Sequence, residues 1–150
     1  MKIIKNISFF IVISILIVLL ANYLETDFLF KYLQNNIIGL LLTLLAIITA
    51  TLGLIASKIQ DILVKYPEFD FSPTIREMKM ALLEQIILIA VSILCLIIQD
   101  SLKITFDLKE FICNTILVTV LIYTISILWD TGKSVFIIID ELQKLKNNTK

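Results

Sequence analysis

Histidine is absent from this chain of 150 residues, and its absence excludes several kinds of chemistry. Histidine is the usual general base at neutral pH, the commonest metal ligand and the partner of nucleophilic serine and cysteine. The formal net charge is zero, so charge gives no evidence for nucleic acid or an acidic substrate as a partner. We therefore expect neither histidine-dependent hydrolysis nor a bound cofactor.

Two short motifs resemble parts of known enzymes but lack the required context. The tripeptide Asp-Thr-Gly at 130–132 occurs in aspartic proteases, where it lies in a β-rich fold and works with a second aspartate. The tripeptide Gly-Lys-Ser at 132–134 matches the end of a phosphate-binding loop, but that loop requires glycine at the position of Ile127. We predict that the protein is not an enzyme and binds no metal ion.

Long apolar runs dominate the sequence instead. Hydrophobic residues make up 59% of the chain and the mean hydropathy is +0.98, well above the values typical of soluble domains. Four runs, at 7–24, 37–57, 81–98 and 111–129, each approach the roughly 20 residues that a membrane-spanning helix needs. We predict an all-α integral membrane protein, with residues 1–150 forming a single four-helix domain in the lipid bilayer.

The basic residues are divided unevenly between the two sides of these spans. Lys31, Lys103 and Lys109 lie on one side, between the first and second or the third and fourth spans. The rest of the 13 lie on the other side: Lys2, Lys5, Lys58, Lys65, Arg76, Lys79, Lys133, Lys144, Lys146 and Lys150. Because basic residues mark the cytoplasmic side, both termini and the central segment are predicted to be cytoplasmic.

The single arginine among many lysines is typical of a low-GC bacterial genome. The location that we predict is therefore the bacterial inner membrane. The first span follows two lysines, as a signal peptide does, but its apolar run is too long and lacks a good cleavage site, so we interpret it as an uncleaved anchor.

Helical patterns continue beyond the apolar ends of the spans. Residues 58–80 contain both prolines, Pro67 and Pro73, in one turn, with helical segments predicted on either side. Apolar residues repeat every three or four positions after the fourth span and extend that helix over about 133–146. These extensions are predicted to protrude into the cytoplasm and, with the turn at 69–71, to receive a protein partner. The outer loops, 25–36 and 99–110, are short.

Small residues gather on one face of the second span. At about 100° per residue, six of them fall within roughly 80°: Gly39, Thr43, Ala46, Ala50, Gly53 and Ser57. Small residues let helix backbones approach closely in lipid. We predict a helix contact at this face, either within one subunit or between the subunits of a homo-oligomer.

Polar residues form a stripe along the fourth span. By the same angle they share about 80° of arc: Thr115, Thr119, Tyr123, Ser126, Asp130 and Lys133. One interpretation is the lining of an ion pore, because hydroxyls and carboxylates facing water coordinate ions in channels. The other is that the hydroxyls bond to their own helix or to a neighbour.

Glu84 is the one acidic residue inside a predicted span, and it lies near the cytoplasmic end. It either pairs there with Arg76, Lys79 or Lys133, or forms with Asp130 an acidic inner mouth that selects cations. Cys95 and Cys113 lie near the loop between the last two spans, where they are either two buried thiols or a disulfide.

The chain resembles the small four-span membrane effectors of bacterial anti-phage systems, such as RexB-like channels and the membrane subunits of Hailong and Kiwa. The resemblance rests on topology: a short hydrophilic break after the second span, a charged start to the third and a fourth helix extended into a charged tail. It implies an oligomer that depolarises the membrane when a cytoplasmic partner is released or activated.

Three functions remain open from the sequence. The first is a homo-oligomeric ion channel gated from the cytoplasmic side. The second is a non-conducting anchor or scaffold subunit for a cytoplasmic partner. The third is a small proton-coupled transporter that uses Glu84, although Glu84 lies away from the midplane where coupling sites usually occur.

Overall fold

The structure, a computed structural model, describes the backbone of residues 2–65, 67 and 70–148. Side chains are described for these residues except 2–6, 65, 138 and 140–148. The described chain forms four helices: α1 (Lys2–Tyr23), α2 (Phe28–Lys65), α3 (Ser72–Asp100) and α4 (Lys109–Asn148). The expectation of an all-α fold is confirmed for these residues.

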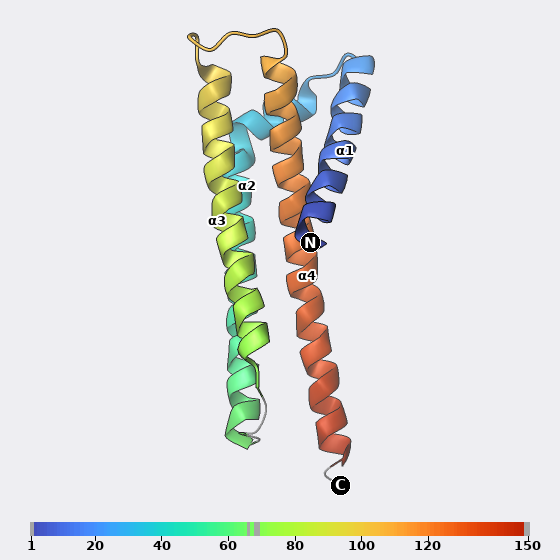
Figure 1. The fold of residues 1–150 in the computed structure, drawn as a ribbon, viewed down its shortest axis with the longest axis vertical. Helices are drawn as coiled ribbons and strands as arrows, with labels where there is room; N and C mark the ends of the chain where they lie inside the picture. The colour runs from blue at the N-terminus through green and yellow to red at the C-terminus, as the bar shows by residue number, and fades with distance from the viewer. Residues whose placement is uncertain (1, 66, 68–69, 149–150) are drawn as a thin grey trace.

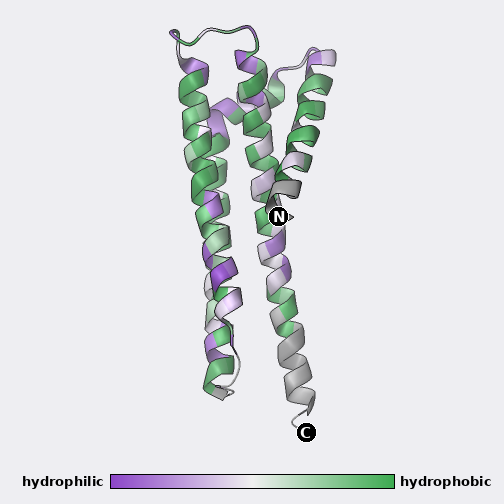
Figure 2. Ribbon diagram, viewed as in Figure 1, coloured by the Kyte–Doolittle hydropathy of each residue, from purple (hydrophilic) through white to green (hydrophobic). Residues whose placement is uncertain are grey.

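Three of the helices, α2, α3 and α4, are long enough and apolar enough to cross a membrane. The described apolar part of α1 is shorter and covers Ile7–Tyr23. Figure 2 shows apolar residues along the upper part of the helices, with hydrophilic residues at their upper ends and again lower in the bundle. This pattern is typical of membrane-spanning helices that are longer than their apolar segments.

Helix α4 lies at the centre of the arrangement (Figure 1). Its backbone approaches those of α1, α2 and α3, and α2 also approaches α3. In the described part of the chain, α1 approaches no helix except α4. Helices α1 and α3 therefore both rest on α4 without closing on each other.

The buried face of α2 packs against α4 and α3 along the whole bundle. Large aliphatic side chains make this face, including Ile37, Leu41, Ile48, Leu52 and Ile55. They belong to two apolar clusters, one at each end of the bundle. Isoleucine and leucine at intervals of three, four or seven residues explain why this stretch is a helix with one packed side.

Helix α2 begins well before the predicted second span, so the expectation of an outer loop at 25–36 is wrong for residues 28–36. Asn35 and Asn36 at the end of this expected loop each donate from Nδ2 to a carbonyl one turn earlier in the same helix, at 2.8 and 2.9 Å. The polar side chains are thus satisfied inside the helix. The connection from α1 to α2 comprises only residues 24–27.

The described part of the turn between α2 and α3 is stabilised by Asp70. The backbone N–H of Ser72 donates to Asp70 Oδ1 at 2.9 Å, at the start of α3. Hydrogen bonding from Ser72 lowers the pKa of the Asp70 carboxyl below its ordinary value. Pro73 follows in the first helical turn, where its missing N–H costs nothing.

Helix α1 ends at a glutamate in the left-handed conformation. Glu25 has φ 52°, and the N–H groups of Glu25 and Thr26 donate to the carbonyls of Asn22 and Ala21 at 3.2 and 3.0 Å. This is the Schellman arrangement, in which glycine usually holds the left-handed position. A residue with a Cβ is strained there by roughly 1–2 kcal/mol.

We expect Glu25→Gly to stabilise the protein by about 1 kcal/mol, because glycine removes this strain. The measurement is unfolding of purified protein in mixed micelles by titration with SDS. Thr26→Gly is the matched control, since Thr26 has no positive φ. Equal shifts for the two variants would contradict the explanation.

Candidate functional site

An acidic cavity of about 310 Å³ opens between α2, α3 and α4. Glu77 and Glu84 of α3 and Asp130 of α4 line it, and Leu52 and Ile55 of α2 form its floor. Hydroxyls from both α3 and α4 also reach it. No basic side chain is among its described lining residues, so the cavity carries acidic groups only.

The carboxylates are arranged at two levels. Glu84 meets Tyr123 across the antiparallel pair α3 and α4. Glu77 lies seven residues before Glu84, and Asp130 lies seven residues after Tyr123. Two helices running in opposite directions therefore place Glu77 and Asp130 at a common level, about 10 Å from Glu84 along the bundle. The predicted combination of Glu84 with Asp130 is thus joined by Glu77, which the sequence analysis did not single out.

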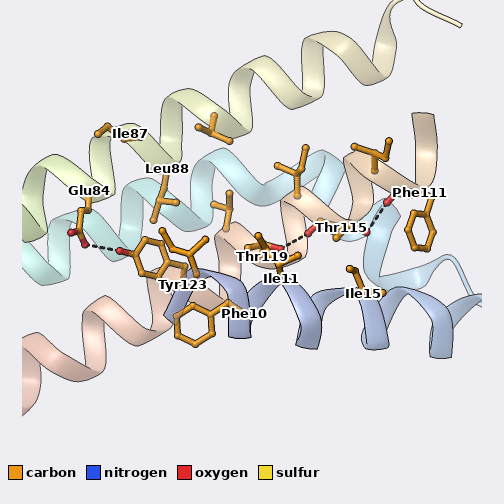
Figure 3. Close-up of a pocket in the computed structure, with 15 residues that line it drawn as sticks. Phe10, Ile11, Ile15, Glu84, Ile87, Leu88, Phe111, Thr115, Thr119 and Tyr123 are labelled. Carbon is orange, nitrogen blue, oxygen red and sulfur yellow. Dashed lines mark hydrogen bonds between the residues drawn. The ribbon is translucent and has the colours of Figure 1, made fainter. Parts of the chain in front are cut away.

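Glu84 accepts a hydrogen bond from the hydroxyl of Tyr123 at 2.9 Å (Figure 3). The ring of Tyr123 in turn lies against Phe10 of α1, with ring centroids 5.7 Å apart. Among the described side chains, Glu84 forms no ion pair with Arg76, Lys79 or Lys133. One of the two interpretations paired Glu84 with a basic residue, and the structure supplies the Tyr123 phenol instead.

A second cavity, the apolar groove, begins at this hydrogen bond and measures about 560 Å³. Helices α1, α3 and α4 line it, and Glu84 borders both this groove and the acidic cavity. The other lining side chains are aliphatic or aromatic, apart from Thr115 and Thr119. These two hydroxyls donate back to carbonyls of α4 at 2.8 and 2.7 Å, as Figure 3 shows.

The polar stripe of α4 is divided between these two spaces. Thr115, Thr119 and Tyr123 line the apolar groove, whereas Asp130 lines the acidic cavity. Ser126 between them is half-buried and lines neither. The described chain therefore brings Tyr123 to Glu84, places Asp130 at the lower level of the acidic cavity, and leaves Thr115 and Thr119 in apolar surroundings.

The small-residue face of α2 points away from the other helices. All six of its residues are exposed: Gly39, Thr43, Ala46, Ala50, Gly53 and Ser57. A Cβ added at Gly39 or Gly53 would meet nothing within 4 Å. Of the two predicted contacts, the one within a subunit is wrong for the described chain, and the contact between subunits stays a prediction.

Three amide side chains form a cluster that the sequence analysis missed. Asn114 Oδ1 accepts from Gln34 Nε2 at 3.3 Å and from Gln99 Nε2 at 3.4 Å. One acceptor on α4 thus joins α2 and α3 near the end of the bundle where α4 begins. The sequence contains no signal for buried Asn114, because its role depends on partners that come from two other helices.

Gln85 and Thr124 are fully buried polar residues in the middle of the bundle. Gln85 Nε2 donates to the carbonyl of Leu41 at 3.2 Å, but Gln85 Oε1 and Thr124 Oγ1 have no partner. The sequence did contain a signal for this buried face of α3, since Gln85, Ser92 and Gln99 repeat every seven residues. Such a repeat marks one face of a packed helix.

The two cysteines lie next to each other as buried free thiols. Cys95 Sγ lies 3.4 Å from the carbonyl oxygen of Cys113, and Cys113 Sγ lies 3.9 Å from that of Cys95. Of the two predicted states, the structure has the thiols. These reciprocal contacts hold α3 and α4 in register.

Within the described residues, no group of three or more cysteine or acidic side chains is arranged to hold a metal ion. The carboxylates of the acidic cavity therefore form a charged surface and no closed coordination shell.

Comparisons of this chain with protein-family models, with curated proteins and with solved structures find no match.

We expect Asn114→Leu to destabilise the bundle by about 1–2 kcal/mol, because two amide donors lose their common acceptor. SDS-induced unfolding of the purified protein measures the change. Asn36→Ala is the control, because Asn36 is exposed and bonds only within α2. A loss no larger than that of the control would show that the cluster contributes nothing.

Thr124→Val is expected to stabilise the protein by about 1 kcal/mol, since valine has the same shape and removes a buried hydroxyl without a partner. Thr119→Val is the matched substitution on the same helix, where the hydroxyl already has a partner and no gain is expected. Thermal unfolding of the two variants in detergent separates these outcomes. Destabilisation by Thr124→Val would reveal a partner for its hydroxyl in solution.

Proposed function

We propose that this chain forms a homo-oligomeric, cation-conducting pore in the bacterial inner membrane, with the acidic cavity as its inner mouth. The observation that supports this proposal best is the set of Glu77, Glu84 and Asp130 around one cavity whose described lining contains no basic side chain. Rings of acidic side chains are a usual means of cation selection in channels. A mouth of this kind raises the local concentration of cations before they enter.

The proposed orientation places this mouth on the cytoplasmic side. The acidic cavity lies toward the end of the bundle where α2 turns into α3, and the basic residues of that end predict a cytoplasmic location. In the proposal α1 also crosses the membrane, as a fourth span, so that both termini are cytoplasmic. The ends of α2 and α4 would then extend into the cytoplasm, where a protein partner could act on the mouth.

The proposed oligomer supplies what one chain lacks. The apolar groove and the acidic cavity meet at Glu84, but the groove has an apolar lining that is unsuited to hydrated ions. A path for ions therefore needs surfaces from several chains. The exposed small-residue face of α2 supports close approach of a second copy, because its backbone is not covered by large side chains.

A non-conducting anchor or scaffold subunit is the second candidate. It is favoured by the surroundings of Thr115 and Thr119, whose hydroxyls donate to their own helix and whose neighbours in the groove are mostly apolar and unsuited to hydrated ions. In either case the resemblance to anti-phage membrane effectors would give the protein a cytoplasmic trigger. The two candidates differ in whether current flows.

Purified protein in planar bilayers is expected to conduct with a preference for potassium over chloride. Glu77→Gln and Asp130→Asn should each reduce the permeability ratio by about threefold or more, because each removes a charge from the mouth. The reversal potential in a potassium chloride gradient measures the ratio.

Asp61→Asn is the control for this experiment, since Asp61 is exposed, pairs with Lys58 and lines no part of the acidic cavity. It should leave the reversal potential unchanged. Absence of current, with or without the product of a neighbouring gene, would overturn the pore and favour the anchor. Current with an unchanged reversal potential in the Glu77→Gln and Asp130→Asn variants would show that the acidic cavity does not select the ions.

A further inference from the structure

The apolar groove exists because α1 and α3 rest on α4 without meeting each other. Its walls come from three helices, with Ile11 and Ile15 on α1, Ile87 and Val91 on α3 and Ile116 on α4. Its volume of about 560 Å³ falls within the roughly 300–1,000 Å³ that is usual for small-molecule sites. Figure 3 shows the side chains of these helices arranged around a common space.

The charge at one end of the groove distinguishes it from a plain gap between helices. Glu84 is the only residue with a charged side chain among its described lining residues. Tyr123 donates to Oε2 of Glu84, and no described group bonds to the other carboxylate oxygen. An ionisable group at membrane depth that faces a cavity is a candidate for ligand recognition.

The remaining polar groups of the groove disfavour other ligands. Thr115 and Thr119 already donate to carbonyls of their own helix, so they have no proton to give to an anion. The described lining contains no lysine or arginine that could hold a phosphate. A phospholipid in the groove would bring its phosphate next to the carboxylate of Glu84, whereas a cation would be attracted to it.

We propose that the groove binds a lipophilic organic cation, with its positive centre beside Glu84 and its apolar groups between α1 and α3. Glu84 borders the acidic cavity as well, so the cation can enter from that polar side and come to lie in the groove. Burial of the apolar groups adds binding energy in proportion to their area. This inference does not depend on conduction, because it concerns occupancy of the groove alone.

Equilibrium dialysis of the purified full chain in detergent, with tetraphenylphosphonium as the probe, tests the proposal. Micelles without protein supply the blank. Tetraphenylborate is the matched comparison, since it has nearly the same size and apolar surface with the opposite charge. The cation is expected to bind at least tenfold more tightly than the anion, after subtraction of the blank.

Glu84→Gln should weaken binding of the cation by about tenfold or more and leave that of the anion unchanged or stronger. Val91→Phe keeps the carboxylate and fills the groove, so it should weaken the cation to a similar extent. Ser126→Ala should have no effect, because Ser126 lies on the same helix and lines neither the groove nor the acidic cavity. Circular dichroism and gel filtration confirm that each variant is folded.

Glu77→Gln distinguishes the groove from the acidic cavity, since Glu77 lines only the latter. It should change binding of the cation by less than twofold. Equal weakening by Glu77→Gln and Glu84→Gln, equal affinity for the two probes, or full binding by folded Val91→Phe would each overturn the proposal. Current from protein that does not bind the cation would contradict this proposal and leave the proposed pore intact. Binding by protein that carries no current would contradict the pore and leave this proposal intact.

Discussion

The antiparallel register of α3 against α4 determines where the polar groups of this bundle meet. Three contacts fix that register along the pair: Gln99 with Asn114, Cys95 with Cys113, and Glu84 with Tyr123. In lipid there is no water to replace a lost polar partner, so each contact matters more to specificity than its strength implies. A shift by one helical turn would break all three at once.

Hydroxyl and amide groups in this bundle are satisfied by two different means. Serine and threonine side chains mostly donate to a carbonyl one turn earlier in the same helix, which needs no neighbour. The amides of Gln34, Gln85 and Gln99 reach other helices instead. The hydroxyl groups therefore give little information about tertiary structure. The three glutamine amides specify which helices pack together.

The position of α1 gives the molecule its asymmetry. Since its backbone approaches only α4 in the described chain, it closes neither the groove beside α3 nor the exposed face of α2. A more compact bundle would have covered both surfaces with side chains. The groove and the small-residue face thus have one origin, which is the attachment of the first helix to a single neighbour.

The sequence by itself determined the helical fold, because apolar length and helical period are local properties of the chain. It predicted four spans, and three of the described helices are long and apolar enough to cross a membrane. It also pointed to Glu84 as the one acidic residue inside a predicted span, and to Asp130 as part of the polar stripe of the fourth helix. The beginning of α2 was misjudged, since Asn35 and Asn36 satisfy their side chains within the helix.

Only the tertiary structure decided which polar residues meet. It paired Glu84 with Tyr123 rather than with a basic residue, added Glu77 to the acidic cavity and gave Asn114 its two partners. It also turned the small-residue face of α2 outward. These outcomes depend on the rotation and register of whole helices, which are set by the summed packing of many side chains and are not encoded in any short segment.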